Sequence, residues 1–107
     1  MDFDISVDNS STICIVKVYG IVDISATPRL DACLSEAVNF GKTDIAIDFE
    51  NCSYIDSECV KVLFKTYRII RDKGRMIICG AHGPVLRVFQ ILGMNALFKI
   101  IPSIECL

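Results

Sequence analysis

The chain has 107 residues, of which 52% are hydrophobic, so it is long and apolar enough for one folded domain and is not a disordered chain. Its 11 basic and 13 acidic residues are mixed along the sequence and give a formal net charge of −2, which provides no basic patch for nucleic acid. We expect a cytoplasmic protein without direct membrane insertion, because polar residues interrupt every apolar stretch before the ~18 residues of a membrane span, and the acidic start MDFDISVDNS is unlike a signal peptide.

The first part of the sequence predicts a hairpin of two strands followed by a helix. The segment FDISVD (3–8) alternates between apolar and polar residues, and TICIVKVYG (12–20) forms the second strand after a polar turn. In the helix that follows, Thr27 can cap the first turn, Pro28 suits the first helical position and Gly41 suits the exit. The residues of its predicted inner face are Leu30, Cys33, Leu34, Ala37 and Val38.

The middle of the sequence predicts a buried strand and then the clearest helix. DIAIDFENCSYI (44–55) is rich in β-branched and aromatic residues, and Ile45, Ile47 and Phe49 share one face. Residues 58–73 follow with helical spacing. Their polar stripe consists of Lys61, Lys65, Arg68 and Asp72, opposite Val60, Leu63, Phe64, Tyr67 and Ile70. We therefore interpret the basic residues of this region as the solvent face of a helix.

The last part of the sequence predicts strand, helix and strand. RMIICG (75–80) is a short buried strand, GPVLRVFQILG (83–93) is a helix, and ALFKII (96–101) is a final strand. Because only Arg87 and Gln90 are polar within the helix after its start, we expect this helix to be largely enclosed.

The predicted order is β-β-α-β-α-β-α-β, which indicates a single α/β domain over residues 1–107: an opening hairpin, then alternating β/α units in a mixed sheet with packed helices. Strand–helix–strand steps favour parallel strands. The loops that follow the carboxyl ends of such strands meet at one edge of the sheet, where ligands and partners bind. Those loops are residues 23–27, 54–58 and 80–83.

The six cysteines are scattered without a C-x-x-C pair, and the chain has one histidine, so no metal site or other cofactor is predicted. We interpret the cysteines as reduced, buried thiols that act as small hydrophobic residues. An enzyme would need Cys59 as a nucleophile with His82 as its base. No group that could orient His82 is identifiable, so we expect no catalysis.

Asp56, Ser57 and Glu58 stand at the start of the second predicted helix. Either Asp56 or Ser57 can cap that helix, and Glu58 suits the dipole of its first turn, so local structure alone can explain all three. In the loop of residues 23–27, Asp23 suits a turn before the helix, and Ser25 and Thr27 can serve as caps.

Three segments together resemble the STAS domain, and in particular the bacterial anti-sigma-factor antagonists: GIVDISATPRL (20–30), NCSYIDSECVKVL (51–63) and GRMIICGAHGPVLRVFQILGMNALFKI (74–100). The resemblance implies a binding protein that docks onto an anti-sigma factor and so releases a sigma factor. In that family the anti-sigma factor is also a serine kinase of the histidine-kinase-like ATPase type. Phosphorylation of a serine at the start of the second helix breaks the complex, and a PP2C-like phosphatase restores it.

The sequence departs from the family motif Asp-Ser-Ser/Thr-Gly at its third and fourth positions. Asp56 and Ser57 match, but Glu58 replaces the phosphoacceptor and Cys59 replaces the glycine. A glutamate cannot accept the phosphate, and its charge of about −1 approaches the −1.5 to −2 of phosphoserine. We hypothesise that the protein is fixed in a phospho-like state, or serves a partner that never phosphorylates it. Alternatively, Ser57 is the acceptor.

The resemblance also implies which residues meet the partner, and it leaves a second assembly open. The implied contacts are Asp23, Ser25, Thr27, Asp56, Ser57, Glu58, Cys59 and Lys61. Cys59 either fills part of that surface or packs inward. Since the acceptor is replaced, the chain could instead be an unphosphorylated STAS subunit of another assembly, such as a lipid-transport ABC complex or a stressosome-type scaffold.

Overall fold

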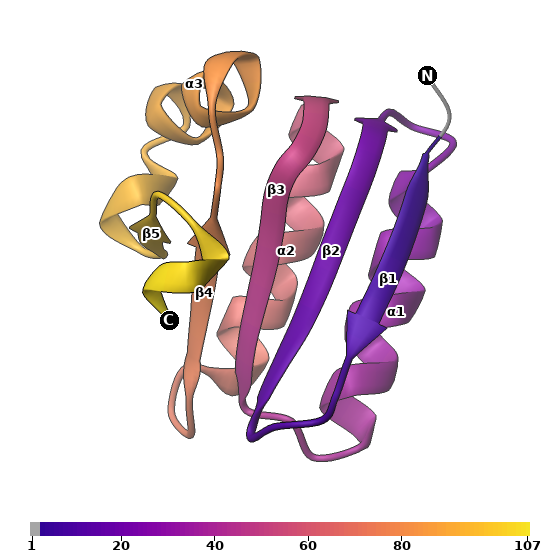
Figure 1. Ribbon diagram of the computed structural model, residues 1–107, viewed down its shortest axis with the longest axis vertical. Coiled ribbons are helices and arrows are strands. Elements are labelled where there is room, and N and C mark those ends of the chain that lie inside the picture. Colours follow the sequence, from indigo (N-terminus) through magenta and orange to yellow (C-terminus); the bar gives the residue numbers. More distant parts are fainter. Residues whose placement is uncertain (1–2) are drawn as a thin grey trace.

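The computed structural model describes residues 3–107, and the first two residues of the predicted domain lie outside that range. The predicted order of strands and helices is confirmed (Figure 1). The elements are β1 (Asp4–Asp8), β2 (Ile13–Val22), α1 (Thr27–Asn39), β3 (Asp44–Ile55), α2 (Ser57–Ile70), β4 (Arg75–Cys79), α3 (Gly83–Ile91) and β5 (Lys99–Ile101), with short 3-10 helices η1 (Met94–Ala96) and η2 (Ile104–Cys106). Within residues 3–107, no helix is both long enough and apolar enough to cross a bilayer.

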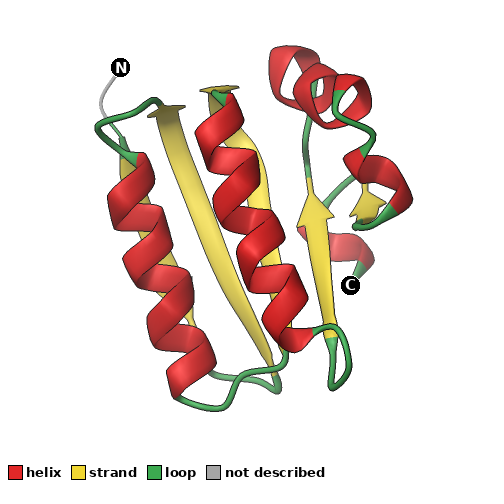
Figure 2. Cartoon of the chain, turned by 180° about the vertical axis from the view of Figure 1, so that it is seen from behind, coloured by secondary structure: helices red, strands yellow, loops and turns green. Residues whose placement is uncertain are grey.

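The five strands form one mixed sheet in the order β1-β2-β3-β4-β5. β1 pairs with β2 in antiparallel fashion, and the three pairs that follow are parallel, as the strand–helix–strand pattern predicts. α1 and α2 lie side by side on one face of the sheet (Figure 2). The main core lies between these helices and the sheet. On the opposite face Ile104 of η2 packs over Ala46, Ile77 and Cys79.

α1 and α2 differ in how their N-termini are capped. Ala26 is the N-cap residue of α1, so the prediction that Thr27 caps this helix is wrong. Thr27 is instead the first helical residue, and its hydroxyl donates to the carbonyl oxygen of Asp23 at 3.0 Å. At the start of α2 the backbone of Asp56 is extended, and its carboxylate accepts from the Cys59 amide at 3.0 Å, as a capping side chain does.

α2 ends at Ile70, before the predicted end at Lys73, and Gly74 has a different role from a helix terminator. A Cβ atom at Gly74 would lie 2.0 Å from the backbone oxygen of Thr43, just before β3. Glycine is therefore required where the start of β4 passes very close to the chain that leads into β3.

The prediction that the third helix is enclosed is wrong. Within α3 only Val85 and Phe89 are buried, and Ile91 is 73% exposed. β4 ends at Cys79, opposite Asp48, while β3 continues to Ile55, and Figure 1 shows β3 reaching higher than β4. α3 packs beside this projecting half of β3 on one side only, which leaves its other side in solvent.

Candidate functional site

Two of the three predicted loops meet at one edge of the sheet. Val22 pairs with Ile55 at the ends of β2 and β3, and the Asp56 amide donates to the Val22 carbonyl oxygen at 3.1 Å. The turn after β2 and the start of α2 are therefore neighbours, and we name residues 23–27 and 56–61 the rim. The third loop lies elsewhere, because His82 Nε2 is 2.9 Å from the carbonyl oxygen of Glu50, alongside the body of β3.

Ser57 presents an exposed hydroxyl at the start of α2. Asp56 supplies the cap, whereas Ser57 is exposed and its hydroxyl makes no hydrogen bond within residues 3–107. Glu58 is also exposed, and its carboxylate lies 3.0 Å from the Lys61 ammonium, with side chains 51% and 73% exposed respectively. Such an exposed pair contributes about 0–1 kcal/mol. Neither side chain is needed to hold the fold, so both are available to a partner.

The turn after β2 is held rigidly by Asp23. Its Oδ1 atom accepts from the Ser25 hydroxyl at 2.7 Å and from the backbone amides of Ser25 and Ala26 at 3.0 and 3.2 Å. These hydrogen bonds, above all the one from the Ser25 hydroxyl, lower the pKa of the Asp23 carboxyl. Asp23 is therefore a turn residue, and its second carboxylate oxygen accepts no hydrogen bond within residues 3–107.

The implied partner contacts divide by accessibility. Asp23, Ser25, Ser57, Glu58 and Lys61 are exposed, and Asp56 is half-buried. Thr27 and Cys59 are 8% and 0% exposed, so both side chains are withdrawn from the surface, and of the two alternatives for Cys59 the structure has the one in which it packs inward. The reason is that Thr27 turns inward to the backbone of Asp23, and the Cys59 side chain packs into the core.

Cys59 does not have the surroundings of a nucleophile. Burial raises the pKa of its thiol, and the neighbouring Cys52 and Asp56 raise it further. His82 contacts Glu50 and provides no base for it. All six cysteines are free thiols, and burial raises the pKa of Cys79 to about 11. Within residues 3–107, no group of three His, Cys, Asp or Glu side chains could hold a metal ion.

An apolar groove that was not predicted from the sequence adjoins the rim. This hollow of about 180 Å³ lies between α2 and the end of α3, and it is lined by Ser57, Val60, Lys61, Phe64, Leu92 and Met94. Gly93 adopts a left-handed φ of 70°, and the chain turn there brings Leu92 and Met94 against α2. The sequence signal for this groove was the apolar run ILGMNAL (91–97). It has more hydrophobic residues than one helix face can bury.

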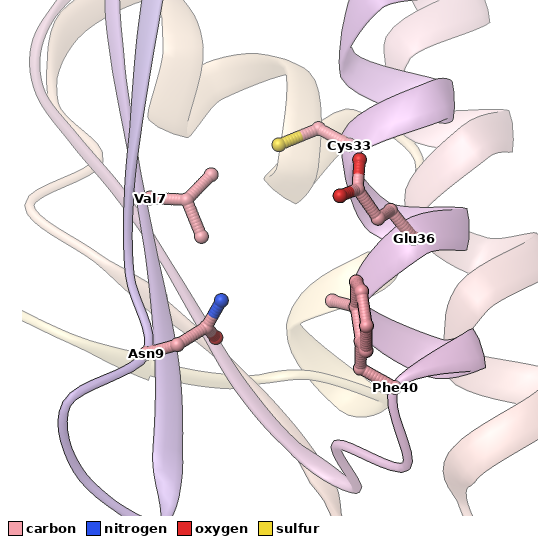
Figure 3. A pocket seen from close by; sticks show the side chains of 6 residues that line it. Val7, Asn9, Cys33, Glu36 and Phe40 are labelled. Carbon is pink, nitrogen blue, oxygen red and sulfur yellow. The ribbon is translucent and has the colours of Figure 1, made fainter.

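A separate hollow lies away from the rim, between the edge strand β1 and α1. Figure 3 shows Val7 and Asn9 of the strand side facing Cys33, Glu36 and Phe40 of the helix side. The volume of the space between them is about 120 Å³. Burial raises the pKa of the Cys33 thiol, so this space holds no activated nucleophile. The rim and the apolar groove remain the strongest candidate site.

Comparison with known proteins gives consistent matches over nearly the whole chain. The family model of the STAS domain matches residues 4–106. The anti-sigma F factor antagonist of Paenibacillus polymyxa is 28% identical over 104 residues, which cover 95% of this chain and 86% of that protein. The anti-sigma-B factor antagonist of Staphylococcus aureus is 29% identical over 86 residues, which cover 79% of this chain and 80% of that protein.

Solved structures share the fold. An anti-sigma factor antagonist from Mycobacterium paratuberculosis superposes with a TM-score of 0.90 at 18% sequence identity, and the match covers 97% of this chain and 89% of that one. At this identity the likeness concerns the fold alone.

Proposed function

The chain belongs to the STAS domain family, and from that premise we propose that it is an anti-sigma factor antagonist, which docks through its rim onto an anti-sigma factor and so controls the release of a sigma factor. The names of the similar proteins from Paenibacillus polymyxa and Staphylococcus aureus support this function. The main observation in support is the exposed start of α2, where Asp56 supplies the cap and the side chains of Ser57 and Glu58 are not needed to hold the fold.

The partner that we propose is an anti-sigma factor of the histidine-kinase-like ATPase type, with serine kinase activity, opposed by a PP2C-like phosphatase. A kinase of this kind needs an accessible hydroxyl, and in the family motif that hydroxyl is at the position of Glu58 in this chain. Here the position holds a permanent carboxylate, 51% exposed and within reach of Lys61.

In this proposal the carboxylate of Glu58 weakens docking permanently, so no phosphorylation is needed to weaken it. A partner that covers the start of α2 has to remove the Glu58–Lys61 pair from water, and desolvation of charges opposes binding. The protein is then held in a state that resembles the phosphorylated one, or it works with a partner that does not phosphorylate it.

A second candidate places the phosphate on Ser57. The free, exposed hydroxyl of Ser57 favours this candidate, since Asp56 rather than Ser57 caps the helix. A phosphate at the first position of α2 would also be stabilised by the positive end of the helix dipole.

Incubation with the cognate anti-sigma factor and ATP separates the two candidates. Intact mass and peptide mapping should show no added phosphate if Glu58 fixes the state, whereas one phosphate that disappears in the Ser57→Ala variant would establish Ser57 as the acceptor. In parallel, Glu58→Ser and Glu58→Gln should each bind the anti-sigma factor about two- to fivefold more tightly, the range expected for a rim charge. Equal affinities would show that position 58 only starts the helix.

A pull-down from the native cytosol tests the broader assignment. Capture of an anti-sigma factor supports the proposed function. Capture of a permease and an ATPase, or of a large scaffold, would instead favour the role of a STAS subunit in a lipid-transport ABC complex or stressosome-type assembly, which the replaced acceptor also suits.

A further inference from the structure

The apolar groove has the size of one large side chain. Its volume of about 180 Å³ is well below the ~300–1,000 Å³ of pockets that enclose small-molecule ligands. Its lining is contributed by the first two turns of α2 and by Leu92 and Met94, so an entering group would touch both segments at once.

The segment that lines the groove from the α3 side carries several exposed apolar residues. Leu92 is 42% exposed, Ile91 next to it is 73% exposed, and Leu97 is 40% exposed. Single exposed aliphatic residues are ordinary on a protein surface, but three of them within residues 91–97, a segment that also lines the groove, favour a site that another molecule covers.

The rim beside the groove offers carboxylate oxygens without partners. Asp23 and Asp56 each use only Oδ1 in the hydrogen bonds that hold their own turns, and within residues 3–107 their second carboxylate oxygens accept none. Glu58 and Lys61 neutralise each other, so the remaining charge of the rim is that of two carboxylates. Such a surface complements a basic side chain.

We propose, resting on the function proposed above, that the groove receives one aliphatic or aromatic side chain of the protein partner, and that a basic side chain next to it on the partner binds the carboxylates of Asp23 and Asp56. The apolar contact supplies affinity through burial, and the basic contact sets the orientation. Ser57 lines the groove and Glu58 does not, so a charge added at Ser57 would lie at the groove itself.

Photo-crosslinking in the cells that encode the chain tests where the partner sits. A photoreactive phenylalanine analogue is introduced at Leu92, and separately at Phe40, an apolar residue at the end of α1 that is 74% exposed. We expect an adduct from position 92 and none from position 40, with the crosslinked peptide of the partner containing an apolar residue close to Lys or Arg.

The outcomes of this experiment separate the two proposals. No adduct at position 92, equal adducts at both positions, or an adduct with a second copy of this chain would each overturn the groove assignment. An adduct of the expected chemistry whose partner is not an anti-sigma factor would overturn the proposed function and leave the groove assignment standing.

Binding of the captured partner to purified variants gives the second test. Leu92→Lys places a positive charge in the groove at the end of α3, where the helix dipole favours such a charge, so the substitution itself should not destabilise the helix. Ile69→Lys makes the same change near the end of α2, about 18 Å from Ser57 along the helix. Leu92→Lys should lower the affinity at least about tenfold, as loss of a central contact does, while Ile69→Lys should not change it.

The charged contact is tested with Asp23→Asn, which keeps the Oδ1 acceptor of the turn and removes the charge. We expect a loss of affinity of a few-fold and a weaker dependence on salt concentration. Equal affinity of Leu92→Lys and Ile69→Lys, with unchanged melting temperatures, would overturn the groove contact. An unchanged salt dependence in Asp23→Asn would overturn the basic contact.

Discussion

Replacement of Asp56 by alanine should destabilise the protein through one lost acceptor. The Asp56 carboxylate accepts from the Cys59 amide at 3.0 Å, and loss of an N-cap side chain costs about 0.5–2 kcal/mol. Cys59 is 0% exposed, so water cannot easily replace the lost acceptor. We therefore expect a cost near the upper end, about 1.5–2 kcal/mol, in a domain whose whole stability is of order 5–15 kcal/mol.

Two neighbouring variants make the interpretation specific. Asp56→Asn keeps a side-chain oxygen that can accept from the Cys59 amide, so it should cost less than about 0.5 kcal/mol relative to the wild type. Ser57→Ala removes an exposed hydroxyl that has no hydrogen-bond partner in residues 3–107, and should change stability by less than about 0.5 kcal/mol.

Urea unfolding, followed by far-ultraviolet circular dichroism, measures these differences from the transition midpoints at a common slope. A cost of Ser57→Ala equal to that of Asp56→Ala would refute the assignment of the cap. An Asp56→Ala variant as stable as the wild type would refute the estimate from burial.

Three further outcomes are expected. Ser25→Ala removes the main cause of the lowered pKa of Asp23, so carboxyl titration by NMR should show that this pKa rises. A carboxyl whose pKa is lowered by folding stabilises the folded state above its unfolded pKa, and this stabilisation is lost as the pH falls through its folded pKa. The variant should therefore be less stable than the wild type at neutral pH and equally stable in acid. Iodoacetamide at pH 8 should label Cys106 first and the four buried thiols only on unfolding, as mass mapping would show; early labelling of a buried thiol would contradict the structure. Gly74→Ala should cost more than about 2 kcal/mol in urea unfolding, because its Cβ would meet the Thr43 oxygen at 2.0 Å; a loss below about 1 kcal/mol would refute the close approach.

Local patterns predicted the elements well, because each pattern had a single interpretation. The run 44–55 is rich in β-branched and aromatic residues, and β3 has the predicted bounds. The environment of α3 was predicted wrongly for a different reason. The burial of α3 depends on how far β3 extends past the end of β4 at Cys79. The helical periodicity of a sequence carries no information about the relative lengths of two strands.

The candidate site was predictable in its location and less so in its roles. Asp56 and Ser57 are both good capping residues, and only the extended backbone of Asp56 decides between them. Cys59 lies in a polar sequence neighbourhood, yet the helix turns it inward. The apolar groove joins residues about thirty positions apart, so its assembly follows from tertiary packing.

The overhang of β3 beyond β4 leaves α3 attached to the sheet on one side only. Beyond Asp48, β3 pairs only with β2, and Phe89 of α3 meets Phe49 of β3 with ring centroids 5.7 Å apart, while Phe98, just before β5, lies 6.2 Å from Phe89. We expect a helix that is held from one side to exchange its amide hydrogens through partial unfolding, at a lower free energy than the central strands. A partner side chain bound between α2 and Leu92 would contact both segments at once, hold the end of α3 against α2 and slow that exchange.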